Sequence, residues 1–206
     1  MQGRAHADDF SGHRGPDRRP APGGLRLVEE FLNTVSGLQG GVDILAERDG
    51  LAAWLASRGL SLESAVDDAD VRRAVDVREA MRALLADPDA ASVEARSTIE
   101  RAAVRAQLAL CFDEDGELRL VARAAGVDGR LGAIVSALYE GLVDGTARRL
   151  RVCRNHGCRW AFYDHSRNGA ARWCSMTVCG ARSKARDYRR RRAATGGSES
   201  DAERSA

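Results

Sequence analysis

Four cysteines near the C-terminus constrain the fold of this chain more than any other feature of its sequence. Cys153, Cys158, Cys174 and Cys179 fall within 27 residues, as two C-x4-C pairs with 15 residues between them. Zinc takes four soft or borderline ligands at tetrahedral angles, and two short turns that carry two thiolates each can supply them. The spacing therefore predicts one structural Zn2+ bound by all four cysteines, with no open position for water or substrate.

Two disulfides, or four unrelated buried thiols, are the alternatives to a zinc site. Disulfides are typical of secreted proteins, but residues 1–24 are polar and lack the apolar core of a signal peptide. No stretch of the sequence approaches the ~20 apolar residues that a membrane span needs. We therefore expect a cytoplasmic protein whose thiols stay reduced and bind metal. His156 could replace one cysteine but is expected in the loop, and Cys111 is expected to be an apolar core thiol.

The charge of the chain is divided very unevenly along its 206 residues. Residues 146–192 contain 14 Arg or Lys and two acids, a net +12, whereas the remainder contains 18 basic and 28 acidic side chains, a net −10. An arginine-rich composition and the formal −2 of a zinc bound by four thiolates explain part of this excess. They do not explain why acids are missing from one segment alone. Basic surfaces of this kind bind nucleic acid most often, and acidic proteins or membranes less often.

Hydrophobic periodicity predicts a mainly helical body. Residues 25–35, 70–87 and about 90–103 follow a helical period, and a further helix is expected to begin with Asp49 as its N-cap and to end at Gly59. The side chains expected on the buried faces at 25–35 and 70–87 are Val28, Phe31, Leu32 and Val35, then Val71, Ala74, Val77, Met81, Leu84 and Leu85. Residues 1–24 and 193–206 have no hydrophobic period, and they are predicted to be a disordered arm and a disordered tail.

A β-hairpin is predicted to interrupt the helices. Residues 104–112 and 118–122 have the composition of strands and flank a turn at Asp115-Gly116. An amphipathic helix follows, and residues 147–153 are predicted to enter the first cysteine pair as a short strand. The side chains expected to face inward on that helix are Leu131, Ile134, Val135, Leu138 and Leu142.

The predicted fold class is α+β, mainly α, with two parts. A helical N-terminal domain with a small hairpin is expected at 25–146, and a small four-cysteine zinc-binding module that ends in a basic helix is expected at 147–192. Trp160, Phe162 and Trp173 could stack on bases, but in a module this small they are expected to form its core.

The segment after Cys179 has good helix formers, no proline and many arginines. Arginine side chains on such a helix reach phosphates and guanine edges. The residues expected to contact nucleic acid are Arg182, Lys184, Arg186, Arg189 and Arg190. The alternative is a solvated helix whose charge only aids solubility. The spacing does not distinguish DNA from RNA.

The cysteine segment also carries a dense set of short motifs. After C-x4-C come Trp160, Phe162, Asp164 and Ser166 as W-x-F-x-D-x-S, then WCSM at 173–176, then Cys-Gly-x-Arg at 179–182. In these motifs it resembles the CGNR-type zinc finger. The N-terminal part, through Asn33-Thr34 and DGLAAWLASRGL, resembles the ABATE domain that accompanies this finger. Together the resemblance covers roughly residues 25–192.

The resemblance implies a bacterial zinc-binding protein that regulates transcription under stress. The chain departs from the family at one namesake position, because Ala181 stands where the family has Asn. Alanine offers no side-chain hydrogen bond, so any contact made by that Asn is not carried over to this chain.

Three classes of function are weighed. The leading hypothesis is a transcription regulator whose zinc module binds double-stranded DNA and whose N-terminal domain senses a small-molecule effector or forms a homodimer. The alternative is a protein- or RNA-binding zinc adaptor without sequence-specific DNA recognition. An enzyme is not expected, because residues 25–150 contain no histidine, no phosphate-binding glycine loop and no nucleophile–base pair.

Overall fold

The computed structural model of the chain describes residues 19–35, 41–87, 89–155 and 157–196. Over these ranges the chain is mainly helical and has two small two-stranded sheets, which confirms the predicted fold class. Most of the expected arm and tail, together with Pro88 and His156, lies outside the described residues. Residues 19–24 are described, and Ala21 is buried there, with its N–H donating to the Glu29 carboxylate at 2.7 Å.

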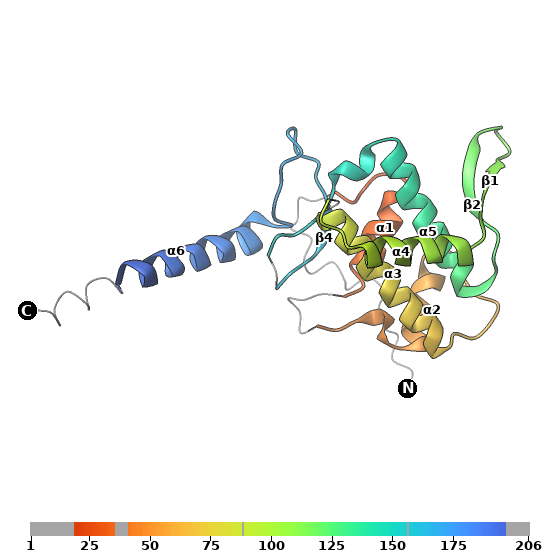
Figure 1. Cartoon of the computed structure of the whole chain (residues 1–206), viewed down its shortest axis with the longest axis horizontal. Coiled ribbons are helices and arrows are strands. Elements are labelled where there is room, and N and C mark those ends of the chain that lie inside the picture. Colours follow the sequence, from red (N-terminus) through yellow and green to blue (C-terminus); the bar gives the residue numbers. More distant parts are fainter. Residues whose placement is uncertain (1–18, 36–40, 88, 156, 197–206) are drawn as a thin grey trace, which may run out of the picture.

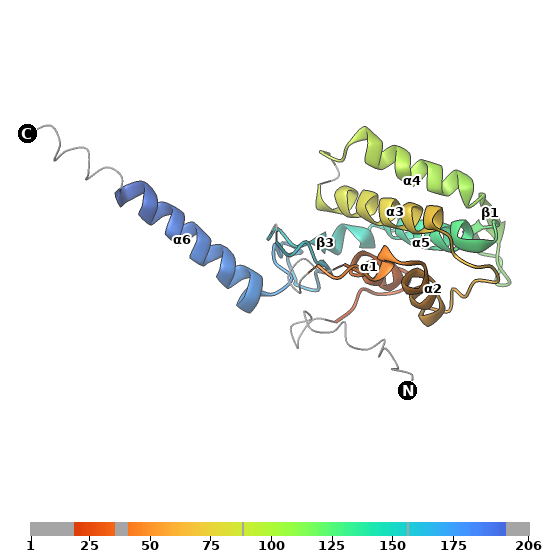
Figure 2. The ribbon, with the colours of Figure 1, turned by 90° about the horizontal axis from the view of Figure 1, so that it is seen from below.

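The helical body is built from five α-helices among the described residues (Figures 1 and 2). They are α1 (Leu25–Leu32), α2 (Arg48–Ser57), α3 (Asp68–Ala86), α4 (Val93–Arg105) and α5 (Gly126–Val143). α3 packs against α4, and α5 packs against both α1 and α4. Their apolar stripes meet in one core, here called the body core, whose fully buried side chains include Val28, Phe31, Leu32, Leu51, Leu55, Ala74, Met81 and Ile134.

The helix ends place several side chains differently from the sequence prediction. α1 ends at Leu32, so Val35 lies beyond the helix and forms an isolated bridge with Asp43. α2 begins after Glu47, so Asp49 lies in its first turn and is not its N-cap. The predicted end of the helix at Gly59 is confirmed, and Gly59 has a φ of +73°.

One side chain of α5 is also placed differently from the prediction. Leu142 was expected inward but is 47 % exposed. The reason is that α1 covers the last turn of α5 at Gly141, where Leu25 approaches closely, and not at the next position along the helix. The other predicted inward side chains of α5, Leu131, Ile134, Val135 and Leu138, are all buried.

The predicted hairpin is present, but its first strand is shorter than the predicted 104–112, because α4 continues to Arg105. β1 (Leu108–Phe112) pairs antiparallel with β2 (Leu118–Ala122), and the turn contains Gly116 at a φ of +80°. The prediction of a core thiol at Cys111 is wrong: this side chain is half-buried and accepts a hydrogen bond from Arg123 at 3.2 Å. Successive residues of a strand face opposite sides, and on β1 it is Leu108 that packs toward α5, near Gly132.

The chain after α5 forms a smaller module. A 3-10 turn (Thr146–Arg149) leads into β3 (Leu150–Val152), which pairs antiparallel with β4 (Ala161–Tyr163). A π-helical turn, η4 (Met176–Gly180), then leads into α6 (Ala181–Gly196), so the first residues of the expected tail are helical. Both views show α6 extending away from the helical body, on the side opposite the hairpin (Figures 1 and 2).

Candidate metal centre and basic helix

The four cysteines of the sequence motif come together in one buried cluster. Cys153, Cys158, Cys174 and Cys179 are each at most 3 % exposed, and their sulfur atoms all lie within 4.8 Å of one another. The distances from the Cys174 sulfur to those of Cys158 and Cys179 are both 3.6 Å. Zn–S bonds of about 2.3 Å at tetrahedral angles put sulfurs about 3.8 Å apart, whereas a disulfide needs about 2.05 Å. The cluster therefore has the size of a four-coordinate zinc site.

Two tight turns present these thiols. In the first, the N–H of Cys158 donates to the Asn155 carbonyl at 2.7 Å, and Asn155 is itself buried. In the second, the N–H of Cys179 donates to the Ser175 carbonyl at 2.9 Å. Each C-x4-C spacing is thus long enough for one turn that returns the second thiol toward the first.

Asp164 organises the loop between the two cysteine pairs. Its carboxylate is 1 % exposed and accepts from the N–H groups of Ser166 at 2.9 Å and Ala171 at 2.8 Å. Arg149 donates from the other side to the carbonyls of Asp164 and Ser166, at 3.0 and 2.7 Å. The aspartate of the W-x-F-x-D-x-S motif, together with Arg149, therefore fixes the path of the chain from the first pair to the second.

Close contact among the sulfurs of Cys153, Cys158 and Cys174 favours ionisation of one of these thiols over the other two. Hydrogen bonds from Cys158 and Cys174 lower the pKa of Cys153, which makes it the favoured thiolate. The same hydrogen bonding with Cys153 raises the pKa of Cys158 to about 12 and also raises the pKa of Cys174. A divalent cation at the centre would offset the repulsion among sulfurs and allow every thiol to lose its proton.

The aromatic side chains of the module are part of its core. Trp160 and Phe162 are 5 % and 2 % exposed and pack with the four cysteines, while Trp173 is half-buried against them. We call this set the module core. The expectation of a structural role is confirmed for Trp160 and Phe162, because a ring that stacks on a base must offer an open face and these two rings offer none. Trp173 packs on the same core with part of its surface open.

The basic helix leaves its predicted contact residues open to solvent. Those residues are Arg182, Lys184, Arg186, Arg189 and Arg190, and all are exposed. Arg190 lies 3.2 Å from Asp187, with 81 % of the arginine side chain exposed. Ala181 is exposed as the first residue of α6.

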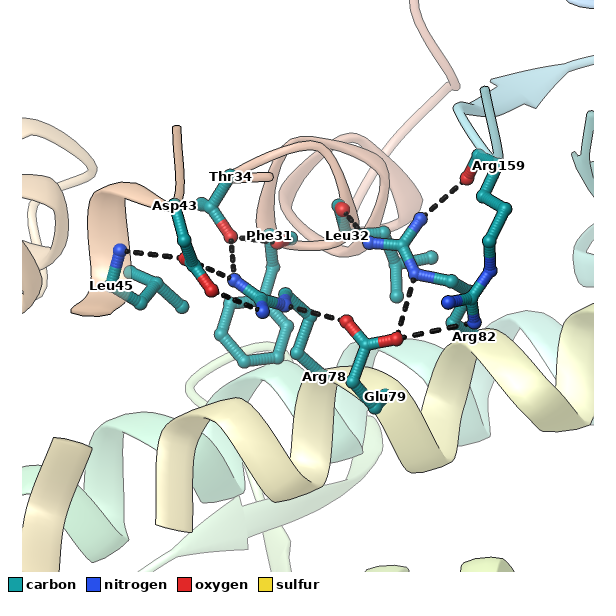
Figure 3. Close-up of polar contacts among 9 residues, drawn as sticks. All are labelled: Phe31, Leu32, Thr34, Asp43, Leu45, Arg78, Glu79, Arg82 and Arg159. Atoms are coloured by element: carbon teal, nitrogen blue, oxygen red, sulfur yellow. Dashed lines mark hydrogen bonds and ion pairs between the residues drawn. The ribbon is translucent and has the colours of Figure 1, made fainter. Parts of the chain in front are cut away.

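Two arginines on α3, Arg78 and Arg82, are buried, which the sequence pattern did not predict (Figure 3). Arg78, 2 % exposed, donates to both carboxylate oxygens of Asp43 at 2.6 and 2.7 Å and to the Thr34 hydroxyl at 3.1 Å. Burial lowers the pKa of Arg78, but the hydrogen bond to Asp43 and the charge of Asp43 have the larger effect, so the pKa of Arg78 is raised. The signal was available, because Arg78 lies on the same helical stripe as Ala74 and Met81.

The second buried arginine, Arg82, joins the helical body to the zinc module. Its guanidinium donates to the Leu32 carbonyl and, at 2.5 Å, to the Arg159 carbonyl, while burial lowers its pKa. Glu79 lies beside it and forms ion pairs with Arg82 at 3.3 Å and with the Arg159 side chain at 3.2 Å (Figure 3). Residues from α1, α3 and the first cysteine turn therefore share one polar network.

A buried four-thiol cluster joined to a basic helix defines a zinc-finger protein. Residues 149–192 match the CGNR zinc finger, and residues 25–145 match the ABATE family, described as "Putative stress-induced transcription regulator". The chain belongs to this ABATE family and carries its CGNR zinc finger at the C-terminal side. The family description is that of a regulator and not of an enzyme. None of the curated proteins matches the chain.

None of the helices in the described part of the chain has both the length and the hydropathy to span a bilayer.

Proposed function

We propose that this chain is a zinc-dependent transcription regulator that binds double-stranded DNA through α6. One observation carries the proposal: a buried cluster of four thiols is followed directly by an exposed helix whose side chains are mainly basic and which projects from the body (Figures 1 and 2). The cluster supplies a rigid base, and the helix supplies the surface that meets DNA.

In this proposal Cys153, Cys158, Cys174 and Cys179 bind one structural Zn2+. The ion neutralises the thiolates and fixes both turns, and so it fixes where α6 begins, directly after the turn that holds Cys179. Four sulfur ligands leave no position for a substrate, which agrees with a role in folding and not in catalysis.

The dimensions and charge of α6 suit a DNA groove. Its 16 residues give a length of about 24 Å, and an α-helix fits into the major groove of B-DNA. We propose that Arg182, Lys184, Arg186, Arg189 and Arg190 contact phosphates and base edges. Arginine also makes a bidentate contact with guanine, so the same side chains can supply affinity and sequence preference.

The helical body takes the regulatory role in this proposal. Residues 25–146 sense a small molecule or form a homodimer in the cytoplasm under stress, and residues 147–192 bind DNA. The charge division supports this assignment, because the chain outside 146–192 carries a net −10 and is repelled by DNA.

The test is an in vitro selection of zinc-loaded, full-length protein on random duplex DNA, followed by titration of the enriched site at several salt concentrations. The triple variant Arg186→Ala, Arg189→Ala, Arg190→Ala should bind more weakly, and the negative slope of log K against log [salt] should become shallower by roughly 2–3, about 0.9 for each phosphate that is no longer neutralised. The measurement is fluorescence anisotropy of labelled DNA.

A matched control removes three exposed arginines from the body instead. Arg72→Ala, Arg101→Ala, Arg105→Ala changes the net charge equally and should leave the affinity and the salt slope nearly unchanged. If both triple variants weaken binding alike, α6 is not the DNA surface. If the protein binds no DNA, and a pull-down recovers RNA, or a protein partner that is retained after nuclease treatment, the adaptor function is favoured instead.

A further inference from the structure

The Asn33-Thr34 motif at the end of α1 meets the zinc module directly, across 128 residues of sequence. The side-chain amide of Asn33 donates to the Ala161 carbonyl at 2.8 Å, and its oxygen accepts the Ala161 N–H at 2.8 Å. Both residues are buried, at 8 % and 0 % exposed. An asparagine side chain thus makes the reciprocal pair of bonds that a neighbouring strand would make with β4.

This contact closes an edge of β4 that β3 does not cover. The Trp160 carbonyl accepts from the Cys153 N–H at 2.9 Å, on the side of β3. Backbone groups of successive strand residues point to opposite edges, so the N–H and C=O of Ala161 point away from β3 and toward Asn33. The two elements together hold β4 from both edges.

A second set of contacts holds the residue that follows Cys158. Arg159 has a φ of +52°, a conformation that residues other than glycine adopt only when their surroundings impose it. Arg82 donates to its carbonyl at 2.5 Å, and Glu79 pairs with its guanidinium at 3.2 Å (Figure 3). The helical body therefore fixes the backbone within one residue of Cys158 and again at Ala161.

β4 also belongs to both hydrophobic cores. Ala161 and Tyr163 pack in the body core, whereas Trp160 and Phe162 pack with the four cysteines in the module core. Since side chains alternate across a strand, one strand can close two cores only if it is held in a single position. A shift of β4 away from the body would move the first cysteine turn with it.

We propose that Asn33 is a positioning residue for the zinc centre, acting through β4 on Cys158. The Asn33 side chain bonds to Ala161 and not to a sulfur. It fixes β4, the strand that begins just after the Cys158 turn, and in this way the helical body contributes to the metal site. The inference rests on the zinc site of the proposed function. By thermodynamic linkage, zinc in turn stabilises the end of α1, so a ligand that displaces α1 would also weaken zinc binding.

The test measures zinc release from the full-length, zinc-loaded protein into excess chromogenic chelator. Asn33→Ala should release zinc about tenfold faster than the wild type, the lower end of the roughly 10–100-fold that supporting hydrogen bonds contribute to metal affinity, because Asn33 acts on the cysteine turn through Ala161. Asn33→Asp should also release it faster, because a carboxylate cannot donate to the Ala161 carbonyl. Ser136→Ala is the control: this buried hydroxyl ties α5 to the Leu120 carbonyl of β2 and should leave the release rate unchanged.

Equal release rates for Asn33→Ala and the wild type would overturn the inference and leave the zinc site standing. A similar acceleration in Ser136→Ala would also overturn it, since general loss of stability would then explain the effect. A wild-type protein that binds no zinc would overturn both this inference and the zinc part of the proposed function. DNA binding is measured separately and does not enter this test.

If neither Asn33 variant folds, amide hydrogen exchange of the wild-type protein decides. Removal of zinc by a chelator should speed exchange at the end of α1 and at Ala161 by at least about tenfold, while α2, whose main contacts are with α3 and with the 3-10 turn Ile44–Ala46, should change little. Exchange at the end of α1 that is the same with and without zinc would overturn the inference.

Discussion

The ion pair between Arg78 and Asp43 gives the sharpest test of the energetics of this fold. The Arg78 side chain is 3 % exposed and Asp43 is 22 % exposed, and two bonds of 2.6 and 2.7 Å join them. Removing one partner of a buried pair costs about 3–5 kcal/mol, because the other charge stays buried and unpaired. Asp43 lies partly in solvent, so we expect Asp43→Asn to lower the free energy of unfolding by about 3 kcal/mol.

The assay is urea or thermal unfolding of zinc-loaded protein, followed by circular dichroism. For a chain of this length, about 3 kcal/mol corresponds to a fall of roughly 6–12 °C in Tm. Adding Arg78→Met to Asp43→Asn should recover part of this stability, because the second change removes the unpaired buried charge. A double variant less stable than Asp43→Asn, or a single variant within about 0.5 kcal/mol of the wild type, would refute this reasoning.

An exposed pair of similar geometry provides the control. Arg48 lies 2.6 Å from Asp68, but the two side chains are 56 % and 64 % exposed. Solvent screens such a pair, so Asp68→Asn should leave Tm unchanged within error. The comparison separates burial from distance, because both pairs have bonds of nearly equal length.

The same pair predicts a dependence on pH. Burial raises the pKa of Asp43, but the hydrogen bond and charge of Arg78 outweigh it and hold the pKa below its usual range. A depressed pKa in the folded state means that Asp43 stabilises the fold above its unfolded pKa of about 3.9, and that this stabilisation is lost as the pH falls through the folded-state value. The stability difference between the wild type and Asp43→Asn should therefore be constant from about pH 7 to 5 and shrink below about pH 4.

Two further predictions concern the metal and the packing of the body. Elemental analysis should find one zinc per chain in the wild type and in Cys111→Ser, because Cys111 lies outside the cluster. Cys174→Ser should contain much less zinc, and equal zinc contents in the two variants would argue against the four-thiol site. Gly132→Ala should lower Tm despite the better helix propensity of alanine, because its Cβ would lie 2.3 Å from the Cβ of Ala106 and 2.8 Å from that of Ala122. An increase in Tm would show that the hairpin yields to the added methyl group.

The sequence was most informative where structure follows from local spacing. The two C-x4-C pairs, the hairpin turn at Gly116 and the buried stripe through Ala74, Val77 and Met81 depend on residues close together in the chain, and each is present in the structure. The exposed arginines of α6 follow in the same way, because a helix without apolar side chains at a regular period has no face to bury.

The sequence was less informative at element boundaries and for lone residues. Asp49 has the side chain of an N-cap, but α2 begins one residue before it, and Val35 continues the α1 pattern after the helix has ended. Cys111 is apolar in character, yet which face of β1 is covered depends on where the hairpin lies against α5. Such outcomes depend on neighbours that the local pattern does not contain.

The sequence alone determined that this chain has a four-thiol cluster, a basic C-terminal helix and a helical body, because each is encoded by periodicity, spacing or composition over short segments. Only the tertiary structure decided that Arg78 and Arg82 are buried and that Asn33 bonds to Ala161. These side chains are polar, so composition assigns them to the surface. They are buried because the fold brings carboxylates and backbone groups to them from segments up to 128 residues away, and those hydrogen bonds offset the loss of hydration.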